Sequence, residues 1–490
     1  MNRAALVQRV RNTAPSILGW GVSGLLIFWA MHLRHPLMYF LRPVETPFLL
    51  MVGLIGSIMA FRAWHRTVWF STRMRHAATL ILMLAILCLT VSAEWRYQVQ
   101  RREVLAARWD MRAIGRHFVI GFRDWGALPE LAQKGLIGGI YLTARNVEGL
   151  DVQTVSRRVA HLQALRAKAG LPPLLVAADQ EGGKIAHLSP LLPRTPPLSS
   201  IAHLSPRQAA DAAYAYGLRQ GRSLHGVGVN LNLSPVVDLK PAKPIAFGDT
   251  HTRISQRAIA GDTEVVANIA RAYSAGLEAA GVQPTLKHFP GLGRVRQDTH
   301  HRAAWLNLPR EDLTQDWLPF REVSRDTGAA IMLGHVVLGQ IDPQHAVSHS
   351  ERVVQRVIRQ EWGYRGLLIT DDLNMGAVYG KGIGTVAAEA LNAGVDLILI
   401  SYDPDQYFPA LHTAAKRLFS GSMDKQRLVQ SDKRLIERFQ GKLSPETKDQ
   451  PAPEASVAGV TEESAPPLSS LRSTPLLPNL RALAISQASL

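Results

Sequence analysis

The chain has 490 residues, of which 47% are hydrophobic and 19% charged, a composition that excludes a wholly disordered protein. Its single cysteine, Cys88, excludes a disulfide framework, a cysteine-rich zinc site and an iron–sulfur cluster. The net charge of +16 is compatible with nucleic acid, an acidic membrane surface or an acidic polymer as a partner. Because arginines crowd the N-terminal part beside apolar segments and form no block of the nucleic-acid type, we expect contact with a membrane and none with nucleic acid.

Three stretches near the N-terminus contain no Lys, Arg, Asp or Glu: Asn12–Leu33, Thr46–Phe61 and His76–Ala93. The first and third are long enough to cross a hydrocarbon core of about 30 Å, whereas the second is short. We therefore predict that residues 1–104 form a membrane segment with about three transmembrane helices. Buried helices of a soluble protein are the alternative.

The distribution of arginine predicts the orientation of this segment. Three arginines precede the first stretch and four lie between the second and third, whereas only two lie between the first and second. Positive charge stays on the cytoplasmic side, so the residues after Ala93 are expected on the outer side. Arg96, Arg101 and Arg102 oppose this orientation, and it reverses if the second stretch does not span. The expected location is a bacterial inner membrane, with the large domain on its periplasmic side.

From about residue 105 to residue 435, short apolar runs alternate with amphipathic helical patterns such as Val152–Ala169, Pro206–His225 and Asp262–Ala280. The predicted strands are Phe118–Phe122, Gly138–Leu142, Leu174–Ala178, Val229–Leu233, Pro284–Lys287, Ala329–Leu333, Leu367–Thr370 and Asp396–Ile400. About eight β–α alternations predict an α/β domain at residues 105–440, closed as a (β/α)8 TIM-type barrel. An open doubly wound sheet is the alternative, disfavoured because no Gly-x-Gly-x-x-Gly turn follows the first strand.

The last part of the chain, residues 441–490, differs again in composition. It is rich in Pro, Ser, Ala and Glu, which bury little apolar surface. We predict a disordered tail there and assign it no chemistry.

Ionisable residues follow the predicted strands, at the end where barrel enzymes place their chemistry. In the stretch Lys287–His300, Asp298 and His300 are two residues apart, so the carboxylate can orient the imidazole and raise its basicity. Asp371 follows the seventh predicted strand, where it could attack an electrophilic carbon. An acid/base and a carboxylate nucleophile are the apparatus of retaining glycoside hydrolysis. No His-Glu-x-x-His motif occurs, and we expect no metal site.

The stretch Lys287–His300 resembles the Lys-His-Phe-x-Gly-x-Gly-x4-Asp-Ser/Thr-His signature of glycoside hydrolase family 3 β-N-acetylglucosaminidases. Asp179–Gly183, Asn232–Asp238 and Thr370–Met375 resemble the same family in order and spacing. The resemblance covers about two thirds of the chain, over residues 105–435. It includes neither the predicted membrane segment nor the tail.

This resemblance implies roles for individual residues. Asp371 matches the nucleophile, His300 the acid/base and Asp298 its partner, on a mobile loop of the barrel. The residues that match sugar contacts are Asp179, Arg257, Lys287 and His288. The resemblance implies no metal and no organic cofactor.

Three positions depart from the family pattern. Leu292 stands where the family often has His, Lys184 where it usually has Arg, and His187 where it has another arginine that contacts sugar. The nucleophile and the Asp–His pair are retained, so these departures affect the choice of sugar rather than the chemistry.

The sequence therefore predicts a membrane-bound retaining glycoside hydrolase. We expect it to remove terminal β-linked N-acetylglucosamine through a covalent glycosyl-enzyme, with peptidoglycan or its fragments as the substrate. Two alternatives remain: a glycoside phosphorylase that uses the same site, and a membrane-anchored protein that binds sugar without turnover.

Overall fold

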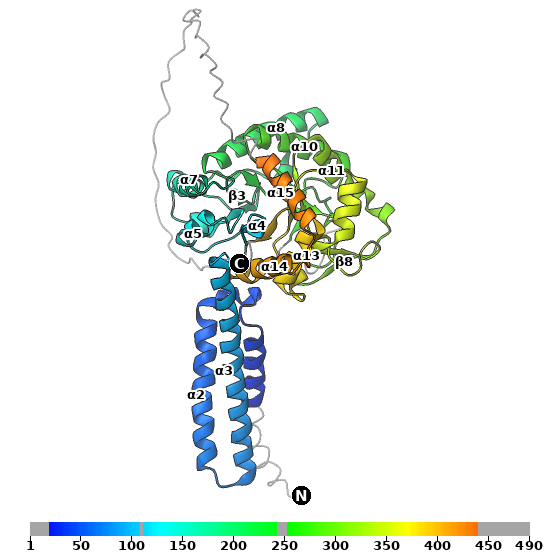
Figure 1. Cartoon of the computed structure of the whole chain (residues 1–490). Coiled ribbons are helices and arrows are strands. Elements are labelled where there is room, and N and C mark those ends of the chain that lie inside the picture. The colour runs from blue at the N-terminus through cyan, green and yellow to red at the C-terminus, as the bar shows by residue number, and fades with distance from the viewer. Residues whose placement is uncertain (1–18, 108–110, 243–251, 440–490) are drawn as a thin grey trace, which may run out of the picture. The chain divides into compact units, whose positions relative to one another are not determined.

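The computed structural model describes residues 19–107, 111–242 and 252–439. The predicted tail at 441–490 lies outside the described residues. The N-terminal elements are a helix at Gly19–Met31, the 3-10 helix η1 (Pro36–Leu41), and the long helices α2 (Arg42–Arg66) and α3 (Phe70–Leu105) (Figure 1). The short second stretch predicted from the sequence is thus the central part of a 25-residue helix.

The helices α2 and α3 pack closely on one another, as Figure 1 shows. Glycine allows this approach, because a Cβ atom at Gly56 would lie 2.5 Å from the sulfur of Met83. Leu49, Met83 and Ile86 are buried between the helices. Both α2 and α3 are long and apolar enough to cross a bilayer, and only 28% and 17% of their apolar windows are buried within the structure.

The rest of the described chain is an α/β domain in which a strand overlaps each of the eight predicted stretches. Seven of these strands lie within the predicted bounds, and the fifth continues past the predicted end at Lys287 to Phe289. These strands are β1 (Phe118–Ile120), β2 (Gly139–Leu142), β3 (Leu175–Ala178), β6 (Leu231–Asn232), β7 (Thr285–Phe289), β9 (Ala330–Leu333), β11 (Leu368–Thr370) and β12 (Ile398–Ile400). Four short strands add to them: β4 (Gln180–Gly182), β5 (Ile185–Ala186), β8 (Ala304–Leu306) and β10 (Val336–Leu338).

The eight strands form two parallel sheets. One sheet has the order β12-β1-β2-β3-β6 and the other β11-β9-β7. Isolated parallel bridges join the sheets, from Leu231 to Gln283 beside β6 and from Ile369 to Leu397 beside β12. The predicted α/β class with parallel strands is confirmed.

Helices connect and cover the strands. The α-helices are α4 (Met111–Gly115), α5 (Leu128–Gln133), α6 (Ala144–Val147), α7 (Val152–Lys168), α8 (Pro206–Gly226), α9 (Ile254–Arg257), α10 (Thr263–Ala279), α11 (Thr314–Asp326), α12 (Gly376–Tyr379), α13 (Ile383–Ala393), α14 (Tyr407–Phe419) and α15 (Lys425–Phe439). The 3-10 helices are η3 (Trp125–Ala127), η4 (Leu198–Ile201), η5 (Arg310–Leu313), η6 (Val347–His349) and η8 (Pro404–Gln406), and η7 (Arg352–Glu361) is π-helical.

Local sequence explains where the long helices begin. Asp151 precedes α7 and accepts a hydrogen bond from the backbone N–H of Thr154, and Asp262 does the same for α10 through Val265. Such caps satisfy N–H groups that have no partner within the helix. The apolar face of each helix then packs on the sheets, which leaves the loops at the carboxyl ends of the strands to carry polar side chains.

Candidate active site

Most of the ionisable residues predicted from the sequence lie at the carboxyl ends of the parallel strands. Asp179 follows β3, Lys287 and His288 lie near the end of β7, and Asp371 follows β11. Parallel strands end at the same edge of a sheet, where α/β proteins bind ligands. The structure therefore brings these four side chains to one end of the domain.

Lys287 is the centre of a buried cluster of charges. Its Nζ lies 2.6 Å from Asp179 Oδ1 and 2.6 Å from Glu181 Oε1, and its side chain is 1% exposed. Arg257 donates two hydrogen bonds to Glu181, at 2.6 and 3.0 Å. Burial would raise the pKa of the Glu181 carboxyl, but Arg257 and Lys287 hold it well below its ordinary value. Two cations and two carboxylates are thereby held rigidly at the site.

A tight hairpin presents Glu181 to this cluster. The strands β4 and β5 pair antiparallel; β4 ends at Gly182, with φ 95°, and the turn begins at Gly183, with φ 61°. A Cβ atom at Gly182 would lie 2.2 Å from the hydroxyl of Tyr216, so glycine is required there. In the Asp179–Gly183 stretch, the glycines are therefore needed for the hairpin, and the two carboxylates belong to the charge cluster.

Asp238 holds the end of β7 in place. The buried carboxylate of Asp238 accepts hydrogen bonds from the backbone N–H groups of His288 and Leu292, and one from His288 Nδ1 at 2.7 Å. These bonds orient the His288 ring so that its Nε2 lies 3.4 Å from Arg257 Nη2. Asp238 therefore positions His288 and the start of the loop that follows.

Asp298 and His300 form a hydrogen-bonded pair on that loop. Asp298 Oδ1 lies 2.9 Å from His300 Nδ1, and the same oxygen accepts a bond from the backbone N–H of His300. The Asp298 side chain is 3% exposed, whereas that of His300 is 40% exposed. The buried carboxylate thus orients an imidazole that reaches solvent, which is the arrangement an acid/base needs.

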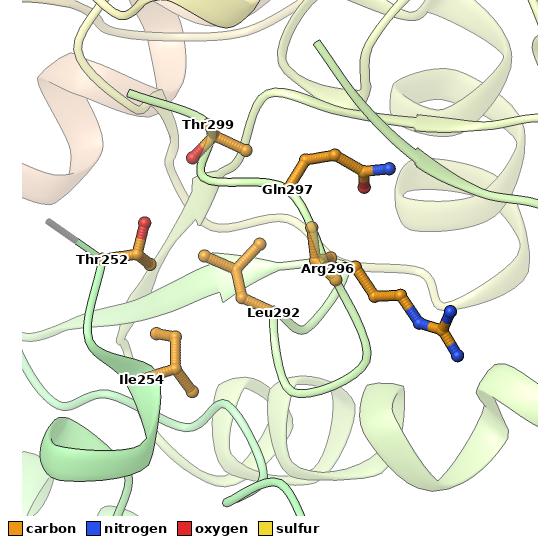
Figure 2. Close-up of a pocket in the computed structure, with 7 residues that line it drawn as sticks. Thr252, Ile254, Leu292, Arg296, Gln297 and Thr299 are labelled. Atoms are coloured by element: carbon orange, nitrogen blue, oxygen red, sulfur yellow. The ribbon is translucent and has the colours of Figure 1, made fainter. Parts of the chain in front are cut away.

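Thr252 joins this pair from a distant part of the sequence. Its hydroxyl lies 3.0 Å from Asp298 Oδ1 and 3.3 Å from His300 Nδ1. Figure 2 shows Thr252 beside a small cavity behind the loop, which Leu292 and Thr299 also line. Leu292 is buried and belongs to the hydrophobic core, which accounts for an apolar residue at this position.

The loop that carries Asp371 contacts the loop that carries His300. In α12, which begins five residues after Asp371, the N–H groups of Gly376 and Ala377 donate to the carbonyls of His300 and Thr299. A Cβ atom at Gly376 would lie 2.6 Å from the carbonyl oxygen of His301, so only glycine permits this approach. The Asp–His pair and Asp371 are therefore held by one continuous hydrogen-bonded structure.

Three imidazoles set the charge state of Asp371. Burial would raise the pKa of its carboxyl, but His288, His335 and His300 together hold it below the ordinary value of 3.8. His335 is buried beside the loop, with Nε2 3.0 Å from the carbonyl oxygen of Asp372. Asp371 is thus an ionised carboxylate near neutral pH.

Asp372 differs from its neighbour in its contacts. Its carboxylate accepts hydrogen bonds from the backbone N–H groups of Ser401 and Tyr402 and from the Ser401 hydroxyl at 2.6 Å. These bonds tie the loop after β11 to the loop after β12. The carboxylate of Asp372 thus holds the two loops together, whereas that of its neighbour Asp371 interacts with the three imidazoles.

A cavity of about 440 Å³ adjoins the charge cluster. It is lined by Glu181, Arg257 and Lys184, by the buried Ser234, and by apolar residues such as Val236. Lys184 Nζ donates to Gln256 Oε1 at 2.8 Å. The cavity thus combines the charged groups of the cluster with an apolar wall, as sites for small polar ligands do.

Sequence reasoning did not identify every residue of this site. Glu181 lies in the Asp179–Gly183 stretch that resembles the family, but no role was predicted for it. Its place between Asp179 and two glycines could have indicated a site residue. Thr252 gave no signal, because 46 residues separate it from Asp298. His187, which departs from the family pattern, lies 3.0 Å from the hydroxyl of Tyr141 through its Nδ1.

Across residues 19–107, 111–242 and 252–439, no group of three or more His, Cys, Asp or Glu side chains is arranged to hold a metal ion.

Comparison with known proteins agrees with the geometry. Residues 112–437 match the family described as "Glycosyl hydrolase family 3 N terminal domain". A β-hexosaminidase from Nitrosomonas eutropha is 36% identical over 280 residues, which cover 55% of this chain and 75% of that protein. A β-hexosaminidase from Xylella fastidiosa (strain M12) is 34% identical over 291 residues, covering 58% and 82%.

Solved structures show the same fold. A family 3 β-N-acetylglucosaminidase from Paenibacillus sp. superposes with a TM-score of 0.61 and 30% identity, over 68% of this chain and 62% of that one, so the match spans less than two thirds of its length. A β-N-acetylhexosaminidase from Beutenbergia cavernae gives a TM-score of 0.60 and 28% identity, over 68% and 98%. The chain therefore belongs to glycosyl hydrolase family 3 and is a glycoside hydrolase.

Proposed function

We propose that this protein is a retaining β-N-acetylhexosaminidase that removes terminal β-linked N-acetylglucosamine. The observation that carries the proposal is the direct contact between two loops: the one bearing the Asp298–His300 pair and the one bearing Asp371. An oriented imidazole and an ionised carboxylate at one site are what a double displacement at an anomeric carbon requires. The names of the relatives described above support the choice of sugar.

The mechanism has two steps. In the first, His300 donates a proton to the leaving oxygen while Asp371 attacks the anomeric carbon and forms a glycosyl-enzyme. In the second, His300 takes a proton from water, which attacks the same carbon and releases the sugar. Asp298 holds Nδ1 of the imidazole, so that Nε2 is the atom that exchanges the proton. Each step is carried by side chains of this chain.

The charge cluster supplies the contacts to the sugar. Asp179, Arg257, Lys287 and His288 present charged donors and acceptors at the same end of the sheets as Asp371. Hydrogen bonds to charged groups are about twice as strong as neutral ones, so they select hydroxyl geometry well. Because the cluster neutralises itself, it binds an uncharged sugar without an unpaired charge.

We further propose that the two parallel sheets close into a single eight-stranded barrel. Bridges between Leu231 and Gln283 and between Ile369 and Leu397 join them on both sides, which supports a closed ring of strands. In such a barrel the active site lies at the carboxyl ends of the strands.

We propose that α2 and α3 cross a membrane with the catalytic domain on the outer side. Arg34 and Arg42, at the domain end of these helices, are paired with Glu94, Asp403 and Asp405. The ends of α2 and α3 that meet at the turn carry arginines at positions 62, 66, 73 and 75. These arginines favour the cytoplasmic side for the turn, whereas Arg96, Arg101 and Arg102 at the domain end of α3 oppose that orientation. An outer catalytic domain would meet peptidoglycan or its fragments.

The stereochemistry and the products of the reaction test this function. With the full chain and an aryl β-N-acetylglucosaminide, the first sugar released is expected to be the β-anomer, followed by NMR. An α-anomer as the first product would contradict the two-step mechanism. In phosphate buffer, free sugar is expected. Sugar 1-phosphate would identify a phosphorylase, and binding without turnover would identify a sugar-binding protein.

The acidic side of the pH profile gives a further prediction. A carboxyl whose pKa is lowered keeps its charge to lower pH, so protonation of Asp371 should not reduce kcat/KM until the pH falls below its ordinary pKa of 3.8. The measurement uses a dinitrophenyl leaving group, which needs no proton from His300. The circular dichroism spectrum at each pH shows whether the enzyme remains folded, and recovery of activity on return to neutral pH excludes irreversible inactivation. A decline of kcat/KM with its midpoint above 3.8 would contradict the assignment of Asp371.

The close approach at Gly376 predicts a second result. Gly376→Ala should lower kcat/KM by about 10- to 100-fold, because the new Cβ displaces the loop that carries His300. Gly380→Ala is the matched control, since a Cβ there meets no atom within 4 Å. The melting temperature of both variants should stay near that of the wild type. Equal activity of the two variants would show that the contact is not needed.

A further inference from the structure

The segment that joins the first helix to α2 contacts α12, which follows the loop that bears Asp371, and the loop after β12. The ring of His35 lies 4.2 Å from that of Tyr379, the last residue of α12. The ring of Tyr39 lies 5.2 Å from that of Tyr402, in the loop after β12. Since α12 donates hydrogen bonds to the carbonyl of His300, both sides of the proposed catalytic pair are reached from this segment.

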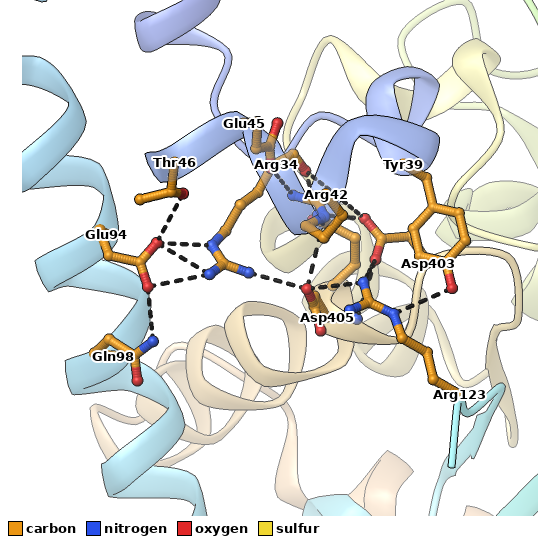
Figure 3. A network of polar contacts seen from close by, with 11 residues as sticks. Arg34, Tyr39, Arg42, Glu45, Thr46, Glu94, Gln98, Arg123, Asp403 and Asp405 are labelled. Carbon is orange, nitrogen blue, oxygen red and sulfur yellow. Dashed lines mark hydrogen bonds and ion pairs between the residues drawn. The ribbon is translucent and has the colours of Figure 1, made fainter. Parts of the chain in front are cut away.

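Charged groups bind the same segment to the loop after β12. Figure 3 shows Arg42 and Arg34 pointing toward Asp403 and Asp405. Arg42 pairs with Asp403, and Arg34 Nη1 lies 2.9 Å from Asp405 Oδ2. Arg123 donates to Asp405 from the other side, at 3.1 Å. The loop after β12 is thus held by arginines from two directions.

The pair of Arg42 and Asp403 is buried. The side chain of Arg42 is 4% exposed and that of Asp403 is not exposed at all. Burial raises the pKa of the Asp403 carboxyl, and the charge of Arg42 opposes this rise. Removing one member of a buried pair leaves an uncompensated charge, which is far more harmful than removing both. The loop would then move until water reaches Asp403.

Such a movement would reach the nucleophile within a few residues. Ser401 and Tyr402 precede Asp403 directly, and their N–H groups are donors to the carboxylate of Asp372. Asp372 follows Asp371, and its own N–H donates to Asp371 Oδ1 at 2.9 Å. The path from Arg42 to Asp371 therefore consists of three hydrogen-bonded contacts and a short piece of loop: Arg42 to Asp403, the loop 401–403 to Asp372, and Asp372 to Asp371.

We propose that Arg42 is a positioning residue for the glycosidase reaction, so that the N-terminal helical segment is part of the catalytic apparatus and not only an anchor. The inference rests on the proposed function, because it takes Asp371 to be the nucleophile. The N-terminal segment would then help to position Asp371, a role that its apolar composition does not indicate. An error of about 1 Å in the place of a reacting group costs about 10²-fold in rate.

The test uses the full chain in lipid nanodiscs and a soluble aryl β-N-acetylglucosaminide. Arg42→Met keeps the length of the side chain and removes the charge, and is expected to lower kcat by about 10- to 100-fold. KM should change little, because the sugar contacts at Asp179 and Lys287 are untouched. Arg42→Lys should retain more activity than Arg42→Met. The exposed Arg62, in the same helix, provides the matched control Arg62→Met, which should behave as wild type.

A combined variant separates positioning from stability. Arg42 Nη1 also lies 2.8 Å from Oε1 of the buried Glu45, so Arg42→Met is combined with both Asp403→Asn and Glu45→Gln. These changes leave neither carboxylate charged without Arg42, so kcat should recover toward the wild-type value. The melting temperature and the fraction of folded protein are measured for every variant. If Arg42→Met has wild-type kcat per folded molecule, whatever its melting temperature, the inference is wrong.

Two further variants keep the result interpretable. If Arg42→Met does not fold, His35→Ala replaces it, with a smaller loss of kcat expected through Tyr379 and α12. Wild-type kcat in His35→Ala would then reject the inference. Asp371→Ala is measured in parallel. If that variant is as active as the wild type, the proposed function fails, whereas loss of activity there with no effect at Arg42 rejects only the present inference.

Discussion

Asp371→Ala is expected to lower kcat/KM for an aryl β-N-acetylglucosaminide by at least about 10⁴-fold, the scale on which the loss of a nucleophile or its partner is felt in other hydrolases. Without the carboxylate no glycosyl-enzyme forms, and the positive charge that develops at the anomeric carbon loses its counter-charge. The structure adds a reason, since the neighbouring imidazoles hold the pKa of this carboxyl below its ordinary value although the group is buried. The measurement is steady-state hydrolysis by the purified full chain.

A matched variant and a chemical rescue support this test. Asp312→Ala removes an exposed carboxylate in η5 and should leave activity unchanged. The space left by Asp371→Ala admits a small anion, so azide should restore part of the turnover of a substrate with a good leaving group and yield an α-glycosyl azide. Activity near the wild-type level in Asp371→Ala would show that another residue attacks the sugar.

His300→Ala is expected to have the second largest effect, and the size of the effect should depend on the leaving group. General acid catalysis contributes about 10²- to 10⁴-fold. The loss in kcat/KM should approach that range for alkyl or methoxyphenyl glycosides and be much smaller for a dinitrophenyl glycoside, which departs without a proton. The value of kcat/KM reports the first step, so the slope of log(kcat/KM) against leaving-group pKa is the quantity to compare.

Two variants serve as references for His300. Asp298→Asn keeps the shape of the partner and removes its charge, so it should show a smaller loss with the same dependence on the leaving group. His161→Ala changes an exposed histidine in α7 and should match the wild type. A loss in His300→Ala that is equal for all leaving groups would mean that His300 does not act as the acid.

The positions of the strands could be predicted because most are short apolar runs buried on both faces, although β7 also contains Thr285, Lys287 and His288. β3 and β9, for example, are fully buried and contain no polar residue. The ends of β6 were less predictable. The predicted Val229–Leu233 is reduced to Leu231–Asn232, because Asn232 uses its side chain to bond Gln180 and the Ser234–Pro235 sequence follows.

The site could be predicted where its residues are close in sequence and not where they come from separate loops. Asp298 and His300 are two residues apart, so their spacing alone indicates a pair. Thr252 and Glu181 contribute through long-range contacts, which depend on how the loops fold over the sheets. Thr252 has no unusual neighbours in sequence, so no local pattern distinguishes it from an ordinary polar residue. Glu181 stands between Asp179 and two glycines, a pattern that marks the stretch but does not show the contacts of Glu181 with Arg257 and Lys287.

The N-terminal segment shows the same limit. Its apolar stretches were evident, but the pairing of Arg42 with Asp403 joins residues 361 positions apart. From sequence, Arg42 and Arg34 counted only as positive charges in a loop. In the structure they are paired with carboxylates. This pairing changes the charge balance across the proposed membrane, and it shows that the loop binds the catalytic domain.

The helix α3 has 36 residues without interruption, so it is about 54 Å long at about 1.5 Å per residue. Its apolar part, His76–Ala93, accounts for about 27 Å, close to the thickness of a bilayer core. The remaining part continues as helix and contacts α14, where Glu103 pairs with His412 at 2.7 Å. If α3 spans the bilayer as proposed, this part, about 18 Å of helix, lies against the domain, because Arg34 joins Glu94 to Asp405 at its membrane end. The enzyme is then held rigidly at the lipid surface rather than by a flexible linker. The active site then acts only within a thin layer above the lipid surface, and glycan strands farther out must approach the membrane before they can be cleaved.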